Sequence, residues 1–256
     1  MTSPRTAPRA ATARERARAE LTREIKEEAR RQLAATGADG LSLRAVAREL
    51  GMVSSALYRY YPSRDDLLTA LIIDAYNALG DAAERAIASP AAARERWIAA
   101  WHAVRDWARS NPHEYALIYG SPVPGYRAPE ATIGPAARVP LAFVGIIRGA
   151  LAAGEFTAVH ETLPVTGVLA EQADELSAAL ARTPVLARST VLARSMGAAE
   201  SPDLPPDALV RAVIAWAQLF GMISFELFGQ FVGSFEPADA LFAHAAAQSA
   251  AFVGLR

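Results

Sequence analysis

The chain shows no convincing alternation of apolar and polar residues, the pattern of a half-buried β-strand, anywhere along its 256 residues. Apolar residues recur instead at helical spacing, between breakers rich in glycine and proline. In residues 13–36 the side chains of Leu21, Ile25, Ala29 and Leu33 form one stripe. Gly37 follows, and glycine is common in the position that caps the C-terminus of a helix. The sequence therefore predicts an all-α fold.

Further helices are predicted between the breakers. Ser42 is a candidate N-cap for the second helix, and Ser63 with Asp66 resembles a capping box for the fourth. Residues 120–136 contain four prolines and three glycines and are expected to be a loop, with Pro140 an obstacle to the start of the next helix. The expected helices after the first are 43–50, 53–61, 64–88, 91–109, 112–119, 137–152, 164–182, 185–197, 206–229 and 237–253.

The small net charge of −1 conceals an asymmetry along the chain. Residues 1–64 contain thirteen Lys and Arg against seven Asp and Glu, a balance of +6, whereas residues 65–256 carry −7. A basic head on an acidic body indicates a polyanionic partner at one end only. A solvated run of charge is the plainer interpretation, unless a motif coincides with the basic region.

Several chemistries are disfavoured by what the sequence lacks. It has no cysteine, and its four histidines show no metal-ligand spacing, so neither a metal nor another cofactor is expected. It contains no phosphate-binding glycine loop and no nucleophile elbow, and Glu171, Asp174 and Glu175 are expected to be a solvated face. An enzyme is therefore the weaker alternative. Without a signal peptide or an uninterrupted apolar run near eighteen residues, a soluble cytoplasmic protein with no membrane partner is expected.

A motif does coincide with the basic region. In residues 42–68, two short helical segments are separated by a turn containing Gly51, and the second carries polar and aromatic residues. This is the plan of a helix-turn-helix, with an ordinary helical hairpin as the alternative. Val46, Leu57 and Tyr61 are assigned to the core.

The detailed residues resemble the DNA-binding domain of the TetR family of regulators over about residues 15–70. One departure is Val53, where a capping Ser or Thr is usual, so that Ser54 or Ser55 is expected to cap the recognition helix instead. The residues that carry the resemblance are Leu50–Met52, Leu57–Tyr61, Pro62–Arg64 and Asp66–Leu67.

The resemblance implies which residues contact operator DNA. Arg59 is suited to a bidentate contact with a guanine edge, and the small Ser54, Ser55 and Ala56 allow a close approach to bases. Base-facing residues are then Arg44, Ser55, Ala56 and Arg59, and residues near phosphates are Ser42, Tyr58, Tyr60 and Arg64. Packing of Tyr58 or Tyr60 against the first helix is the structural alternative.

Residues 94–126 resemble the WHG domain of a branch of TetR-like regulators, which implies a ligand-binding and dimerising bundle. Aromatic side chains on neighbouring helices suit a pocket for a small apolar molecule, although such a stripe is also typical of a core. The candidate ligand-binding residues are Trp101, Tyr115, Tyr119, Phe143, Ile147, Trp216 and Phe220, with His102 and Glu226 as polar anchors.

The last two helices are apolar around most of their circumference and must be covered on several sides. Burial within one chain is one solution, and a four-helix interface between two copies is the other. The small residues Ala245, Ala246, Ala247, Ser249 and Ala250 are expected to permit close approach of a second copy.

Together these features predict three parts: a disordered basic arm (1–14), a three-helix helix-turn-helix domain (15–66), and a larger helical bundle for ligand binding and dimerisation (67–256). The expected protein binds a palindromic double-stranded operator as a homodimer and is released by a small-molecule effector, as a repressor unless the operator position makes it an activator. A constitutive DNA-binding protein without an effector pocket is the alternative.

Overall fold

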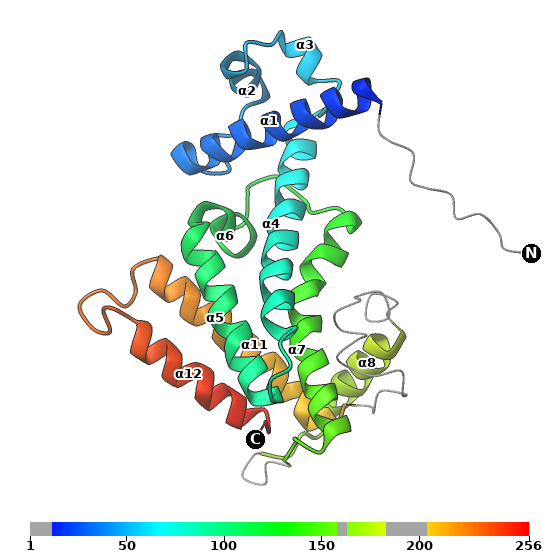
Figure 1. Ribbon diagram of the computed structural model, residues 1–256, viewed down its shortest axis with the longest axis vertical. Helices are drawn as coiled ribbons and strands as arrows, with labels where there is room; N and C mark the ends of the chain where they lie inside the picture. Colours follow the sequence, from blue (N-terminus) through cyan, green and yellow to red (C-terminus); the bar gives the residue numbers. More distant parts are fainter. Residues whose placement is uncertain (1–11, 158–162, 183–203, 256) are drawn as a thin grey trace, which may run out of the picture. The chain divides into compact units, whose positions relative to one another are not determined.

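The computed structural model describes residues 12–157, 163–182 and 204–255. These residues form helices joined by turns and loops, with an isolated bridge between Phe156 and Leu255 (Figure 1). The expected helix 185–197 and residues 1–11 of the expected arm lie outside the described residues. The helices are α1 (Ala13–Thr36), α2 (Leu43–Glu49), α3 (Ser54–Leu57), α4 (Arg64–Ile87), α5 (Ala93–Ser110), α6 (Pro112–Tyr119), the 3₁₀ helix η1 (Glu130–Thr132), α7 (Ile133–Ala153), α8 (Val168–Arg182), α11 (Pro206–Leu227) and α12 (Asp239–Phe252).

The described chain divides into two compact units. The first contains residues 12–71 and 122–126, and the second contains the remaining described residues, so that α4 begins in the first unit and ends in the second. The domain boundaries expected from the sequence stay predictions. Ala13 and Arg14, expected in the arm, already belong to α1, because Thr12 and Glu15 form a capping box that starts the helix there.

The first unit is built on the predicted apolar stripe of α1. Ile25, Ala29 and Leu33 are buried, and they are joined in the core by apolar side chains of α2, α3 and the start of α4. The three residues assigned to this core are confirmed: Val46, Leu57 and Tyr61 are buried.

The second unit is a helical bundle with an aromatic core. Trp97 and Trp101 on α5 are buried, Trp97 packing edge-on against Phe143 of α7 with ring centroids 4.7 Å apart. The indole Nε1 of Trp97 donates to Ser249 Oγ at 3.2 Å, which satisfies a buried donor and ties α12 to α5.

That packing changes the role expected for the small residues of α12. Ala245, Ala246, Ser249 and Ala250 are buried within the single chain, where they let α12 lie close to α5. The alanines of α12 that stay exposed are Ala240, Ala243 and Ala251. The expectation that Ala245, Ala246, Ser249 and Ala250 face a second copy is therefore wrong, whereas Ala247 is half-buried.

The predicted loop 120–136 ends earlier than expected. α7 starts at Ile133 and continues through Pro140 to Ala153. Pro135 is compatible with this start, because the first four N–H groups of a helix have no partner within it. Pro140 removes one backbone hydrogen bond inside the helix, and the buried apolar side chains of α7 offset that loss.

Two described helical segments, Glu130–Ala153 and Pro206–Leu227, are long and apolar enough to cross a membrane by length and composition alone. Burial inside the bundle explains the composition of the first, because Leu141 to Arg148 are all buried. In α11 several apolar side chains are exposed, among them Ile214 and Phe225.

Candidate nucleic-acid interface and effector cavity

The turn between α2 and α3 is fixed by local backbone chemistry. Gly51 has a φ of +64°, in the left-handed region that side chains disfavour. Its N–H donates to Arg48 O at 3.1 Å, and the next N–H, of Met52, donates to Ala47 O at 2.8 Å. These two bonds form a Schellman motif, which ends α2 and sends the chain into α3. Ser42 Oγ caps the other end of α2 by accepting from the Ala45 N–H at 3.4 Å, as predicted.

The start of the recognition helix differs from the expectation. α3 begins at Ser54 after Val53, and no side chain caps it, so neither Ser54 nor Ser55 takes that role. The Val53 backbone is extended, and Val53 O accepts from the Ala56 N–H at 2.9 Å. The serines are thereby in the first helical turn, where Ser55 is exposed and Ser54 half-buried.

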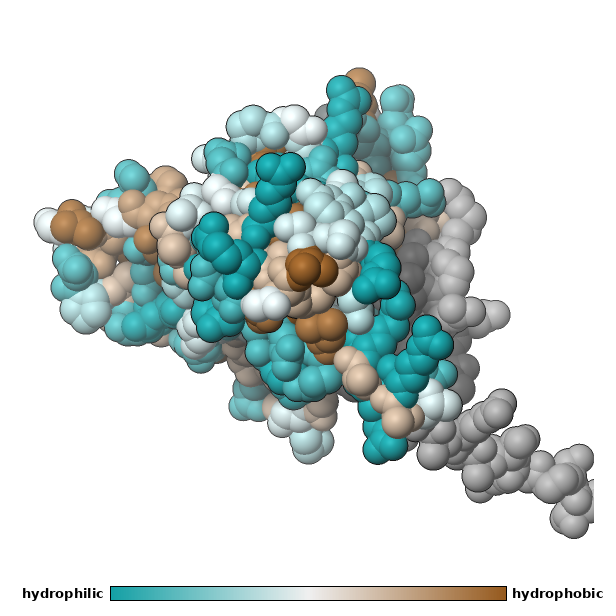
Figure 2. All heavy atoms as spheres, turned by 90° about the horizontal axis from the view of Figure 1, so that it is seen from above, coloured by the Kyte–Doolittle hydropathy of each residue, from teal (hydrophilic) through white to brown (hydrophobic). Residues whose placement is uncertain are grey.

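Two arginines are presented outward by this motif. Arg44 on α2 and Arg59 just after α3 are exposed, and neither has an ion pair or hydrogen bond with the described residues. Figure 2 shows one face of the molecule, and this face is mainly hydrophilic with small hydrophobic spots. An arginine without a protein partner keeps its fork of donors available for a phosphate or a guanine edge.

The residues expected near phosphates have different surroundings. Tyr58 is 42% exposed, whereas Tyr60 is half-buried with the Arg18 guanidinium of α1 5.1 Å from its ring centroid, as the structural alternative anticipated. Arg64 is the first residue of α4, and its Nη2 donates to Ala38 O at 2.7 Å. Arg64 therefore also holds the turn between α1 and α2.

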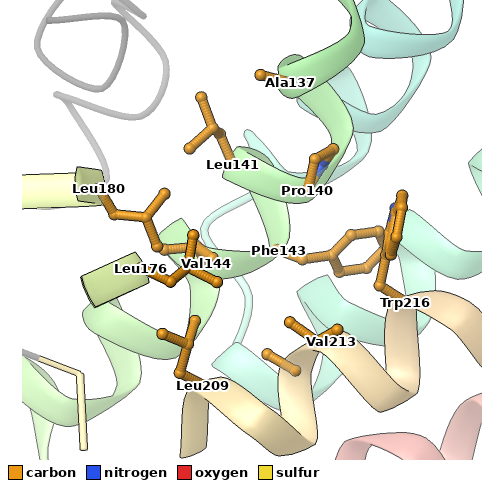
Figure 3. Close-up of a pocket in the computed structure, with 11 residues that line it drawn as sticks. Ala137, Pro140, Leu141, Phe143, Val144, Leu176, Leu180, Leu209, Val213 and Trp216 are labelled. Carbon is orange, nitrogen blue, oxygen red and sulfur yellow. The ribbon is translucent and has the colours of Figure 1, made fainter. Parts of the chain in front are cut away.

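A separate cavity of about 250 Å³ lies in the second unit, between α7, α8 and α11 (Figure 3). Its lining is almost wholly apolar. The indole Nε1 of Trp216 is buried and has no hydrogen-bond partner among the described residues. The lining residues are Ala137, Pro140, Leu141, Phe143, Val144, Leu176, Leu180, Leu209, Ala212, Val213 and Trp216.

Of the nine residues predicted to bind ligand, Phe143 and Trp216 line this cavity. Four others fill the core, and they are Trp101, Ile147, Tyr119 and Phe220. Tyr119 stacks on Phe220 with ring centroids 4.0 Å apart. The remaining three have partners in the bundle, and they are His102 against Phe242, Tyr115 bonded to Phe220 O at 3.0 Å, and Glu226 paired with Arg105 at 2.7 Å.

Burial governs the ionisation of the two tyrosines. Burial raises the pKa of Tyr115 to about 12, opposed by its hydrogen bond with Ser224 at 2.8 Å. Burial also raises the pKa of Tyr119, and the neighbouring Tyr76 and Tyr115 add to the effect. Both hydroxyls are therefore neutral at physiological pH. The described residues hold no group of three or more side chains suited to a metal ion.

Sequence reasoning missed most of the cavity wall. The wall residues that it missed on α8 and α11 are aliphatic, among them Leu176, Leu180 and Leu209, and any amphipathic helix would carry such residues. The signal available was helical spacing, as in Leu176 with Leu180 or Leu209 with Val213, and this spacing does not distinguish a cavity from a core.

Comparison with known proteins agrees with this arrangement. Residues 25–71 match the family described as bacterial regulatory proteins, tetR family, and residues 97–248 match the one described as tetracyclin repressor-like, C-terminal domain. The second match covers the aromatic bundle and does not name the WHG branch, which stays a prediction.

Individual relatives point the same way. The chain is 40% identical over 222 residues to the HTH-type transcriptional regulators Rv1816 of Mycobacterium tuberculosis and Mb1846 of Mycobacterium bovis, with 84% of each chain covered. The solved structure of SCO4313 superposes with a TM-score of 0.69 at 36% identity, covering 93% of this chain and 98% of that one. A protein of unknown function from Rhodococcus sp. RHA1 shares the fold, with a TM-score of 0.61 at 24% identity. The match covers 91% of this chain and 93% of that one. The chain therefore belongs to the TetR family of bacterial regulatory proteins, and it is a DNA-binding transcriptional regulator rather than an enzyme.

Proposed function

We propose that this regulator is a repressor that binds a palindromic operator as a homodimer and is released by a small apolar or aromatic effector. The observation that carries the proposal is the pair of exposed arginines on the helix-turn-helix, Arg44 and Arg59, which have no partner in the described part of the chain. In this assignment Arg59, Arg44, Ser55 and Ala56 face bases, and Ser54 lies beside them. Ser42, Tyr58, Tyr60 and Arg64 lie along the phosphates, and the protein acts in the cytoplasm.

The proposed operator geometry and the surface of α11 both support a homodimer. Two recognition helices about 34–36 Å apart meet successive major grooves, so a palindrome requires two copies. The face of α11 formed by Ile214, Ala217, Gly221 and Phe225 is exposed in the single chain at a spacing of three and four residues. A second copy packed on this apolar stripe would cover it.

The cavity between α7, α8 and α11 supports an effector and favours this function over a constitutive DNA-binding protein with a filled core. An apolar cavity of about 150 Å³ holds benzene, so a cavity of about 250 Å³ suits a neutral molecule of about ten non-hydrogen atoms. Release requires the effector to bind better to a dimer with the wrong spacing of recognition helices, which is a population shift between two states.

The test of DNA binding is Arg59→Ala. Loss of a bidentate contact should relax base preference at one position of each half-site and weaken binding to the preferred duplex by about 1–3 kcal/mol. The measurement is selection from a random duplex library followed by titration of the recovered sequence at two salt concentrations. Arg85→Ala, an exposed arginine on α4, is the matched control. If both variants recover the wild-type motif with wild-type affinity, α3 does not read the bases as proposed.

The test of the effector is to fill the cavity with Ala212→Leu. Ala212 lines the cavity, so the added atoms should block a ligand while leaving operator affinity nearly unchanged. A panel of neutral monocyclic compounds is screened by thermal shift, and each hit is then added to the operator complex. A compound that releases wild type and variant from DNA equally well does not act through this cavity.

A further inference from the structure

We infer that Arg211 is the anion-binding residue of a second ligand site, which takes a carboxylic acid with an apolar body. Arg211 is 3% exposed and lies in the second turn of α11. It lines a groove of about 520 Å³ whose other walls are mainly apolar: Leu163, Pro164, Val165, Leu169, Asp207, Val210, Ile214 and Phe252. This groove shares no lining residue with the effector cavity.

The guanidinium of Arg211 has donors left over. Its Nη1 donates to Asp207 Oδ2 at 2.7 Å, and Asp207 is 45% exposed. Its Nε and Nη2 are buried, and neither has a hydrogen-bond partner among the described residues. Because a guanidinium stays charged, two buried N–H donors without an acceptor are costly, and an anion that accepts both would recover the loss.

In two other arginines of the same bundle, the edge of the guanidinium formed by Nε and Nη2 is paired with a carboxylate. Arg105 donates from Nε and Nη2 to the two oxygens of Glu226, both at 2.7 Å. Arg138 donates from Nε and Nη2 to the two oxygens of Glu84, at 2.9 and 2.8 Å. In both, the paired carboxylate is half-buried and a second, more exposed aspartate is also bound.

Arg211 repeats this arrangement with one part missing. The exposed aspartate is present, as Asp207, but no described carboxylate occupies the Nε and Nη2 edge. A ligand carboxylate would complete the arrangement, since side-on bidentate pairing is the preferred geometry of arginine with a carboxylate. The edge is sealed from solvent, so the ligand reaches it by a rotation of the long Arg211 side chain toward the groove.

The groove defines the rest of the ligand. Apart from Asp207, which is paired with Arg211, its walls are apolar residues such as Val165 and Leu169, so the body of the acid is apolar. A groove of about 520 Å³ is within the range of small-molecule sites, roughly 300–1,000 Å³. A medium-chain aliphatic or a substituted aromatic acid satisfies both requirements.

The test uses the full-length protein with sodium octanoate as the probe and octanamide as its neutral counterpart. Octanoate should raise the Tm of the wild type, and octanamide should not. In Arg211→Met, octanoate affinity measured by calorimetry should fall at least tenfold, the equivalent of losing one charge-assisted hydrogen bond or more. Arg85→Met, at an exposed arginine, is the matched control and should bind octanoate like the wild type.

The ligand-free Tm supplies an independent readout. Arg211→Met replaces an incompletely paired buried cation with an apolar side chain of similar length, so the Tm should not fall. A large fall would show that a carboxylate of the chain itself already fills the edge, and that result overturns the proposal. Equal binding of octanoate and octanamide overturns it too. Operator affinity of the variant without ligand should equal that of the wild type, which separates this inference from the proposed DNA binding.

Discussion

Arg105 shows how one buried cation connects three helices at the level of single residues. It extends from α5 to Glu226 on α11 and to Asp239 on α12, at 2.7 and 2.9 Å, and lies 4.8 Å from the ring centroid of Phe242. The hydrogen bonds that Arg105 donates to Glu226 raise the pKa of Arg105, although burial opposes this shift. The hydrogen bond from Arg105 lowers the pKa of Asp239. Because breaking a buried pair leaves a charge unpaired, this cluster holds the helices in one arrangement.

The lowered pKa of Asp239 predicts a pH dependence of stability. Its folded pKa lies below its unfolded value of about 3.9, so the pairing stabilises the fold fully above that value and is lost as the pH falls through the folded pKa. Asp239→Asn should therefore lower the urea midpoint at pH 7, and the difference from wild type should shrink in acid. Urea titrations from pH 7 to pH 2 check this.

Asp106→Asn serves as the control for that series, since Asp106 is an exposed aspartate on α5 with no ion pair among the described residues. Its midpoint should follow the wild type at every pH. A constant difference between Asp239→Asn and wild type down to pH 2 would contradict the pairing argument.

At the scale of elements, α4 and α7 are held together by a close approach. Arg138 on α7 donates to Glu84 on α4 and, through Nη1, to Asn77 O at 2.9 Å, and its Nη2 also contacts Asp81. Gly80 on α4 makes room for this side chain, because a Cβ there would be 2.9 Å from Arg138 Cβ. The glycine is thus needed for packing and not for backbone conformation.

This approach reverses the usual effect of a glycine replacement in a helix. Gly→Ala inside a helix normally stabilises by about 1 kcal/mol, but Gly80→Ala should destabilise by about 1–3 kcal/mol, since the methyl group displaces Arg138. The matched control is Gly149→Ala on α7, whose new Cβ meets only Arg96 Nη2 at 3.7 Å and should stabilise. Urea unfolding of both variants decides. If both variants were more stable than the wild type by the same amount, Arg138 and α7 would be able to move aside without a loss of stability.

At the scale of the whole molecule, the proposed dimer brings two helix-turn-helix motifs to one operator. Ala217 lies in the exposed stripe of α11, where a charge would be buried without a partner in the dimer. Ala217→Glu should therefore yield a folded monomer, because glutamate is a good helix former, and the loss of the second half-site should weaken operator binding. Sedimentation and operator titration measure the two effects.

Ala99→Glu is the control for the dimer, since Ala99 is an exposed alanine in the middle of α5. It should sediment like the wild type. If Ala217→Glu also remains a dimer with full operator affinity, the two copies meet on a different surface.

The local signals of the sequence determined the helices and the DNA-binding motif. Gly51, Ser42 and the stripe of α1 act through backbone conformation, capping and periodicity, which depend on neighbours a few residues away. The capping of α3 was predicted wrongly, because an extended Val53 starts that helix without a side-chain acceptor. The start of α7 was placed too late, because proline is tolerated in a first helical turn.

The cavity, the groove and the use of α12 were decided only by the tertiary structure. Trp101 and Trp216 are both aromatic residues of helices, yet Trp101 belongs to the core and Trp216 lines a cavity. The role of each tryptophan depends on which helices lie beside it. Likewise Arg211 and Asp207 have the spacing of an ordinary surface pair, and only the packing of α11 buries the arginine. Periodicity selects the face of a helix that is buried, but the complementary surface comes from residues distant in sequence, and no local pattern encodes it.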